Sequence, residues 1–156
     1  MQLIRGLYNL RPAHRGCVAT IGNFDGVHLG HQAVIGQLAE KGAELHLPPV
    51  VILFELQPLE FFRGREAPSR LTRFREKLRA LQRYAVERVL CLRFNKRLAD
   101  MSAEAFIRRV LVEGLAVRYL VVGDDFRFGH DRRGDFAMLR AAGEQPCVRS
   151  GPKVGP

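Results

Sequence analysis

The chain has 156 residues, of which 47% are hydrophobic, and this length is typical of one domain with its own core. No apolar run approaches the roughly 20 residues that a membrane-spanning helix needs, and residues 1–5 lack the apolar core of a signal peptide. We therefore expect a soluble, cytoplasmic protein. The net charge of +9 argues against an anionic surface and favours a negatively charged partner.

The positive charge is concentrated between residues 63 and 97, a segment that contains twelve basic and three acidic residues. A nucleotide, a phosphorylated small molecule or a nucleic acid would suit such a segment. The alternative is the solvated face of an arginine-rich surface helix, and the sequence leaves both interpretations open.

Four short apolar runs are predicted to be strands. Each has several consecutive apolar residues, as expected for strands that are covered on both faces. The predicted strands are residues 17–23, 49–55, 88–94 and 117–123.

Amphipathic segments lie between these runs and are predicted to be helices. They are residues 29–42, 73–85 and 103–113, with a further helix at 135–142. Thr72 and Ser102 are the expected N-caps of the second and third helices. The alternation of strands and helices predicts an α/β fold with a parallel sheet and helices on both of its faces.

The polar and glycine-rich segments follow the predicted strands. They are residues 23–31, 55–62 and 123–133. Ligands of parallel sheets bind beyond the carboxyl ends of the strands, near a switch in strand order. We therefore expect these three loops to meet at one binding site.

The segment from Gly22 to His31 is the most informative. Gly22 and Gly26 allow a sharp turn and a close approach of the backbone to a ligand. His28, Gly30 and His31 are expected at the start of a helix, where free N–H groups and the helix dipole attract phosphate. Two imidazoles about one turn apart can both donate hydrogen bonds to that anion.

A metal site is the competing interpretation of this segment. Asp25, His28 and His31 are spaced at three-residue intervals and could ligate zinc, but no fourth ligand suggests itself. Neither a Walker-type loop nor a G-x-G-x-x-G motif is present in the chain. We favour a phosphate site without direct metal ligation by protein.

The other histidines and the cysteines indicate no chemistry of their own. The odd number and wide spacing of the cysteines argue against disulfides and a zinc knuckle. Cys17 and Cys91 are expected to be buried in strands, whereas Cys147 lies near the C-terminus. Surface positions are expected for His14, His46 and His130.

Residues 28–31, His-Leu-Gly-His, resemble the H-x-G-H motif of the nucleotidylyltransferase superfamily, whose members share a Rossmann-like sheet. The surrounding residues 19–31 resemble the opening of the bacterial bifunctional riboflavin kinase/FMN adenylyltransferase family, also called FAD synthetases. Further blocks follow in family order, and the resemblance covers residues 15–143. These blocks are residues 54–58, 70–72, 76–78, 93–95, 122–129 and 134–136.

The resemblance implies that the FMN phosphate attacks the α-phosphorus of ATP, with Mg²⁺ bound to ATP, so that FAD and pyrophosphate form. His28 and His31 would contact the phosphates as catalytic residues. The implied ATP-binding residues are Gly22, Asn23, Phe24, Asp25, Gly26, His28, Gly30 and His31. The implied flavin-binding residues are Gln57, Pro58, Phe62, Arg70, Leu71, Asp125, Phe126 and Arg127, with Gly123 beside the last three.

The chain departs from the family pattern in two places. Leu56 replaces a proline that would stiffen the flavin loop. After Gly143 the family's Ser/Thr-rich segment and its riboflavin kinase domain do not follow. We therefore expect an adenylyltransferase domain at residues 1–143, shortened at its C-terminal end, and a poorly ordered, non-matching tail at residues 144–156.

Three other functions stay open at the level of sequence. The chain could bind flavin or nucleotide without turnover, because the Ser/Thr-rich segment is missing. It could also act on another phosphate acceptor, although the flavin-type blocks argue against this. A nucleic-acid binder is the third alternative, motivated by the basic segment but lacking any recognition signature.

Overall fold

The computed structural model describes the chain except for residues 23–28, 56–65, 85, 94–97, 99 and 123–156. The described part contains a five-stranded parallel sheet with the strand order β1-β4-β3-β2-β5. The strands are β1 (Gln2–Arg5), β2 (Cys17–Ile21), β3 (Pro49–Glu55), β4 (Arg88–Arg93) and β5 (Val117–Val121).

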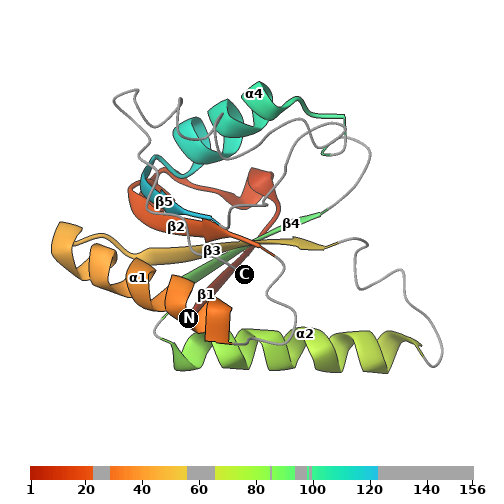
Figure 1. The fold of residues 1–156 in the computed structure, drawn as a ribbon. Coiled ribbons are helices and arrows are strands. Elements are labelled where there is room, and N and C mark those ends of the chain that lie inside the picture. The colour runs from red at the N-terminus through yellow and green to blue at the C-terminus, as the bar shows by residue number, and fades with distance from the viewer. Residues whose placement is uncertain (23–28, 56–65, 85, 94–97, 99, 123–156) are drawn as a thin grey trace.

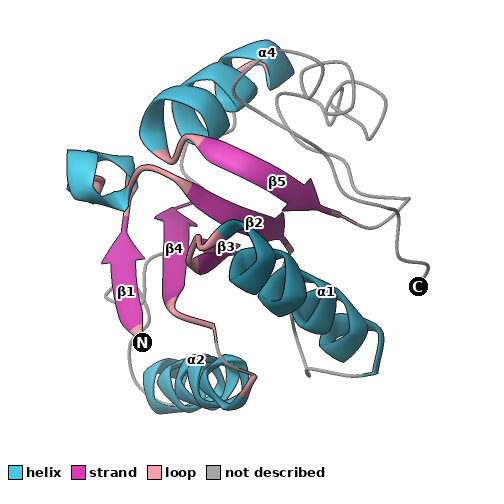
Figure 2. Ribbon diagram, turned by 90° about the vertical axis from the view of Figure 1, so that its left-hand side faces the viewer, coloured by secondary structure: helices cyan, strands magenta, loops and turns pink. Residues whose placement is uncertain are grey.

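Helices cover both faces of this sheet, as Figures 1 and 2 show. On one face lie α1 (Leu29–Leu45) and α2 (Glu66–Arg83). On the other lie α4 (Ala103–Phe106) and its continuation η4 (Ile107–Gly114). Two short turns of helix, η1 (Leu7–Asn9) and η2 (Pro12–His14), connect β1 to β2. The predicted α/β fold is confirmed.

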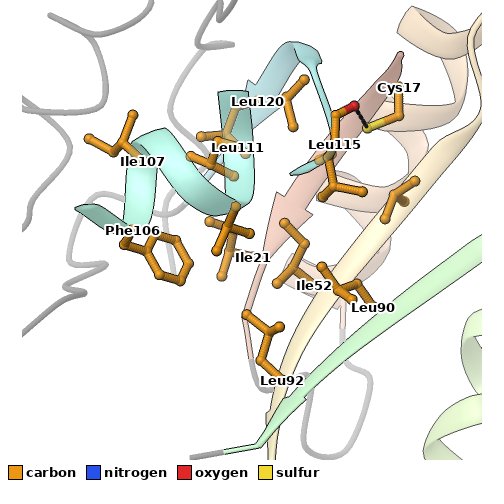
Figure 3. Close-up of a cluster of buried hydrophobic side chains, with 14 of the residues drawn as sticks. Cys17, Ile21, Ile52, Leu90, Leu92, Phe106, Ile107, Leu111, Leu115 and Leu120 are labelled. Atoms are coloured by element: carbon orange, nitrogen blue, oxygen red, sulfur yellow. Dashed lines mark hydrogen bonds between the residues drawn. The ribbon is translucent and has the colours of Figure 1, made fainter. Parts of the chain in front are cut away.

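Side chains of each strand alternate between two apolar layers, because successive residues of a strand point to opposite faces. In β3, Val50 and Ile52 pack on the α4–η4 side, whereas Val51 and Leu53 pack on the α1–α2 side. All four are at most 2% exposed. The layer beneath α4 and η4 is the larger one and includes Phe106 (Figure 3). Burial on both faces explains why the strands appear in the sequence as unbroken apolar runs.

The prediction for the second helix was wrong at its start. The helix α2 begins at Glu66, so Thr72 lies inside it and is not its N-cap. Pro68 falls in the first turn, where a backbone N–H would have no acceptor inside the helix, so proline costs no intrahelical hydrogen bond there. Proline therefore does not delay the start of this helix, although it looks like a breaker in the sequence.

The third helix has the expected position but a different geometry. Ser102 caps it as predicted, since its Oγ accepts a hydrogen bond of 3.1 Å from the Ala105 amide. From Ile107 onward, however, the helix widens into a π-helix instead of continuing as an α-helix. A Cβ at Gly114 would lie 2.8 Å from the Arg109 carbonyl oxygen, so glycine permits this wide turn to close.

The first helix runs three residues beyond its predicted end. It stops where His46 adopts a φ of 57°, and the Leu47 amide then donates 2.9 Å to the Gly42 carbonyl. This 6→1 bond is the Schellman pattern, in which the left-handed position is usually glycine or asparagine. His46 is exposed, as expected.

Cys17 and Cys91 are buried, as predicted. The Cys17 thiol donates to the Leu115 carbonyl at 3.7 Å (Figure 3). Burial raises the pKa of this thiol to about 12, only partly opposed by Arg88, so Cys17 stays protonated and unreactive. Cys147 lies outside the described residues.

Candidate functional site at the carboxyl edge of the sheet

The strand order reverses at β2. The β2–β3 connection passes over the α1 face, and the β4–β5 connection passes over the α4–η4 face to the other side of β2. β2 and β5 are nevertheless direct neighbours, with Thr20 paired to Val121. Such a switch point leaves room for a ligand beyond the carboxyl ends of the two strands. The three segments predicted to form the binding site, residues 23–31, 55–62 and 123–133, follow β2, β3 and β5, which are neighbours in the sheet.

The structure describes the backbone immediately before and after the connection from β2 to α1. Gly22 still donates to the Ile52 carbonyl of β3 at 3.1 Å, so the chain leaves the sheet only after this residue. The next described residue, Leu29, begins α1, whose first turn contains Gly30 and His31. Val34 and Leu38 then anchor α1 against Val18 and Val121. The N-terminus of α1 therefore lies at the same edge as the ends of β2 and β5, and the N–H groups of a first helical turn, which have no acceptor inside the helix, are suited to an anion.

Five of the predicted site residues have a described backbone. Gly22 follows β2, Gly30 and His31 lie in the first turn of α1, and Arg70 and Leu71 lie in the N-terminal half of α2. Because α2 follows β3, this half of the helix begins at the carboxyl edge as well (Figure 1). The remaining predicted site residues lie outside the described part of the chain: Asn23, Phe24, Asp25, Gly26, His28, Gln57, Pro58, Phe62, Asp125, Phe126 and Arg127.

Of the three residues in the metal interpretation, Asp25 and His28 lie outside the described residues, whereas His31 lies in the first turn of α1. Among the residues that the structure does describe, no three His, Cys, Asp or Glu side chains gather into a metal-binding group. No helix in the described ranges is long and apolar enough to span a membrane.

A pocket of about 630 Å³ opens beside the carboxyl ends of β1 and β4, toward the β1 side of the sheet. Its described lining comes from η1, η2, the end of β4 and η4, and contains none of the residues predicted to bind ATP or flavin. The sequence analysis missed this pocket because it missed β1, which pairs with β4 from Gln2↔Arg88 to Arg5↔Cys91. The apolar pair Leu3 and Ile4 was the only signal for this strand.

The prediction that His14 lies at the surface was wrong. His14 is 7% exposed, and its Nδ1 accepts a hydrogen bond of 2.9 Å from the Arg11 amide. Its Nε2 lies 3.2 Å from the Gln2 side-chain amide. Burial lowers the pKa of His14, and the charges of Arg88 and Arg11 lower it further. The sequence feature that accompanies this burial is residues 11–14, in which Pro12 begins a helical turn that ends at His14.

Similarity to known proteins covers most of the chain. The family model for FAD synthetase matches residues 10–150. A bifunctional riboflavin kinase/FMN adenylyltransferase from Pseudomonas fluorescens is 58% identical over 143 residues, which is 92% of this chain and 46% of that protein. Proteins of the same name from Escherichia coli (strain K12) and Haemophilus influenzae are 56% and 50% identical. The chain thus spans about half the length of the curated relatives it matches.

A solved structure shares the fold. The crystal structure of a macrolide-efflux protein from Streptococcus pneumoniae superposes with a TM-score of 0.72 and 21% sequence identity, covering 99% of this chain and 50% of that one. At this identity the likeness concerns the fold alone.

Proposed function

Because the chain belongs to the FAD synthetase family, we propose that it is an FMN adenylyltransferase, which transfers AMP from ATP to the phosphate of FMN and releases pyrophosphate. The activity belongs to the adenylyltransferase half of relatives whose names also include a riboflavin kinase. We assign it to residues 1–143 of this chain, and we place its action in the cytoplasm.

The observation that carries this proposal is the position of residues 22–31. They run from the end of β2 to the first turn of α1, beside the point where the strand order reverses. A nucleotide held there would have its phosphates at the N-terminus of α1, whose dipole favours negative charge. The family's H-x-G-H residues occupy this connection.

The reaction needs no covalent intermediate on the protein. An FMN phosphate oxygen attacks the α-phosphorus of ATP in line, the new P–O bond forms, and the bond to the pyrophosphate oxygen breaks. His28 and His31 donate hydrogen bonds to the phosphate oxygens as charge builds up on them. Gly30 has no side chain to obstruct the nucleotide, and Asn23 to Gly26 line the nucleotide pocket.

Mg²⁺ is proposed to enter bound to ATP and to neutralise phosphate charge. The chain's own contribution is then to orient the two phosphates and to keep the histidine donors in place.

The flavin is proposed to lie across the β3 and β5 ends of the same edge. Gln57, Pro58 and Phe62 follow β3, and Asp125, Phe126 and Arg127 follow β5. Arg70 and Leu71 in α2 would border the ring from the α1–α2 side. Leu56, in place of a proline, would make the β3 loop less rigid and weaken flavin binding.

Chromatographic detection of FAD tests the proposal directly. The purified chain with FMN, ATP and Mg²⁺ should produce FAD and pyrophosphate in equal amounts. His28→Ala should lower turnover about a hundredfold or more while changing flavin affinity little, because the contact strengthens in the transition state. His46→Asn, at the exposed opposite end of α1, is the matched control and should keep full activity.

The outcomes separate the proposal from its main alternative. Equal losses of turnover and flavin affinity in His28→Ala would contradict the assigned role. Binding of flavin and ATP without product, even when the family's Ser/Thr-rich segment is added after residue 143, would identify a binding protein without turnover. Turnover with a different phosphorylated acceptor but not with FMN would reassign the substrate.

A further inference from the structure

The pocket beside the carboxyl ends of β1 and β4 has the size and lining of a small-molecule site. Its volume of about 630 Å³ lies within the range of ligand pockets. The inner wall is apolar and comes from separate elements, with Leu10 before η2, Leu92 in β4, and Leu98 and Met101 before α4. Leu92, Leu98 and Met101 are at most 9% exposed, so this wall is part of the packed core.

Positive charge surrounds this apolar wall. Arg11 and Arg15 approach from the η2 side and Arg109 from η4, and all three are exposed. The described lining contains one acidic residue, Glu113, which lies 4.0 Å from the Nε of Arg108. Arg93 also lines the pocket, so four arginines stand against one glutamate and the net charge of the described lining is positive.

An aromatic side chain stands at the rim. Tyr8 lines the pocket although it is 75% exposed, which leaves its ring free to contact a bound molecule. The ring is held beside Gly6, whose φ is +84° and whose added Cβ would lie 2.7 Å from the Tyr8 Cε1. Gly114 on the opposite wall likewise leaves room for Leu10, whose Cδ1 would be 2.9 Å from an added Cβ. Both glycines allow the walls to approach closely.

We propose that this pocket binds a small organic anion with an apolar or aromatic body and a phosphate or carboxylate group, at a site beside β1 and β4 that is separate from the proposed adenylyl-transfer site at the ends of β2, β3 and β5. The apolar body would lie against Leu92, Leu98 and Met101, and the anionic group would meet Arg11 and Arg109. The pocket opens beside β1 and β4, whereas the switch point lies between β2 and β5 on the other side of β3. The proposal does not depend on the adenylyltransferase assignment.

Titration with 1-naphthyl phosphate, followed by its fluorescence and by saturation-transfer NMR, tests this proposal. The unmodified chain should bind the probe with a measurable Kd, and saturating ATP, Mg²⁺ and FMN should leave that Kd unchanged. The double variant R11Q/R109Q should raise the Kd about tenfold, since charged hydrogen bonds to the anion are lost. Tyr8→Ala should raise it several-fold through the lost aromatic contact.

The control is Arg118→Gln, which removes an equal charge per substitution from an exposed position of β5 outside the pocket. Its Kd should match that of the unmodified chain. Three results would each overturn the proposal: no binding by the unmodified chain at millimolar probe, displacement of the probe by ATP and FMN, or an equal loss in Arg118→Gln. The altered side chains are exposed, and circular dichroism of each variant checks that the fold is kept.

Discussion

At the scale of single residues, His14 shows how a polar side chain is accommodated in the core. It closes the η2 turn, because its Nδ1 accepts the Arg11 amide while the Arg11 carbonyl accepts the His14 amide. A ring whose Nδ1 accepts a hydrogen bond carries its proton on Nε2 when neutral. The Gln2 amide oxygen would then be the natural partner of Nε2, which assigns the orientation of that side chain.

Acid should destabilise the fold through His14. The folded-state pKa is lowered by burial first and by Arg88 and Arg11 second, so below pH 6.5 the unfolded chain takes up this proton more readily than the folded one. The stability associated with neutral His14 is present above pH 6.5 and is lost as the pH falls through the folded-state pKa. Urea unfolding at pH 7.5 and 5.5 should show a larger drop for the unmodified chain than for His14→Asn, which keeps an acceptor but cannot titrate.

The exposed His46 is the comparison for this experiment. His46→Asn removes an exposed imidazole in place of a buried one, and its urea unfolding is measured at the same two pH values. An identical drop in the His14 and His46 variants would show that another group causes the acid sensitivity.

At the scale of elements, two of the glycines in α1, Gly36 and Gly42, have opposite surroundings. Gly36 is exposed, and a Cβ built on it meets nothing within 4 Å. Gly42 is buried where the helix ends, and its Cβ would lie 2.7 Å from the Leu47 carbonyl oxygen and 3.3 Å from Val18. The same substitution should therefore have opposite effects at the two positions.

Gly36→Ala should stabilise the chain by about 0.5–1 kcal/mol, because alanine loses less backbone entropy in a helix. Gly42→Ala should destabilise it by about 1–3 kcal/mol, because the C-terminal turn must move to admit the methyl group. Thermal unfolding of the two variants beside the parent chain measures both effects. A gain in stability at both positions would mean that the turn at Leu47 yields without cost.

The helix α2 begins seven residues before the start that the local sequence pattern predicts. The helix extends back to Glu66, so it presents Arg70 and Leu71 near the carboxyl edge on a helix rather than on a loop. Its later residues Phe74, Leu78 and Leu81 pack on the sheet, while Arg75 and Arg79 are exposed. This arrangement agrees with the solvated-face interpretation for that part of the basic segment.

At the scale of the whole molecule, the larger core layer joins both ends of the chain's described part to the centre of the sheet. Phe106 is 2% exposed, and its ring centroid lies 6.0 Å from that of Phe54 in β3. The same layer contains Ile4 from β1 and Val122 after β5 (Figure 3 shows its centre). Loss of packing at this point should therefore be felt by the entire sheet.

Phe106→Ala should reduce the free energy of unfolding by about 3–5 kcal/mol. This is a large part of the roughly 5–15 kcal/mol that holds a domain folded. Tyr8→Ala, which removes an exposed ring, should change it by about 0.5 kcal/mol or less. Urea denaturation measures both values, and a small effect at Phe106 would argue against a single cooperative core.

The sequence by itself determined the fold class, the strands β2, β3, β4 and β5, and the segment that connects β2 to α1. Unbroken apolar runs identify strands buried on both faces, and the glycine and histidine pattern at residues 22–31 indicates a phosphate site. These signals are local, so they can be interpreted without knowing the neighbours. The family assignment rests on the same local blocks.

Only the tertiary structure decided which strands are neighbours and that a pocket lies beside β1 and β4. The pairing of β1 with β4 joins residues more than 80 positions apart. The four residues of β1 are too few to show a pattern from which this pairing could be predicted. That pairing buries His14 and forms the arginine-rimmed pocket beside β4. Features of this kind depend on contacts between distant segments, and the chain acquires them only when the sheet assembles.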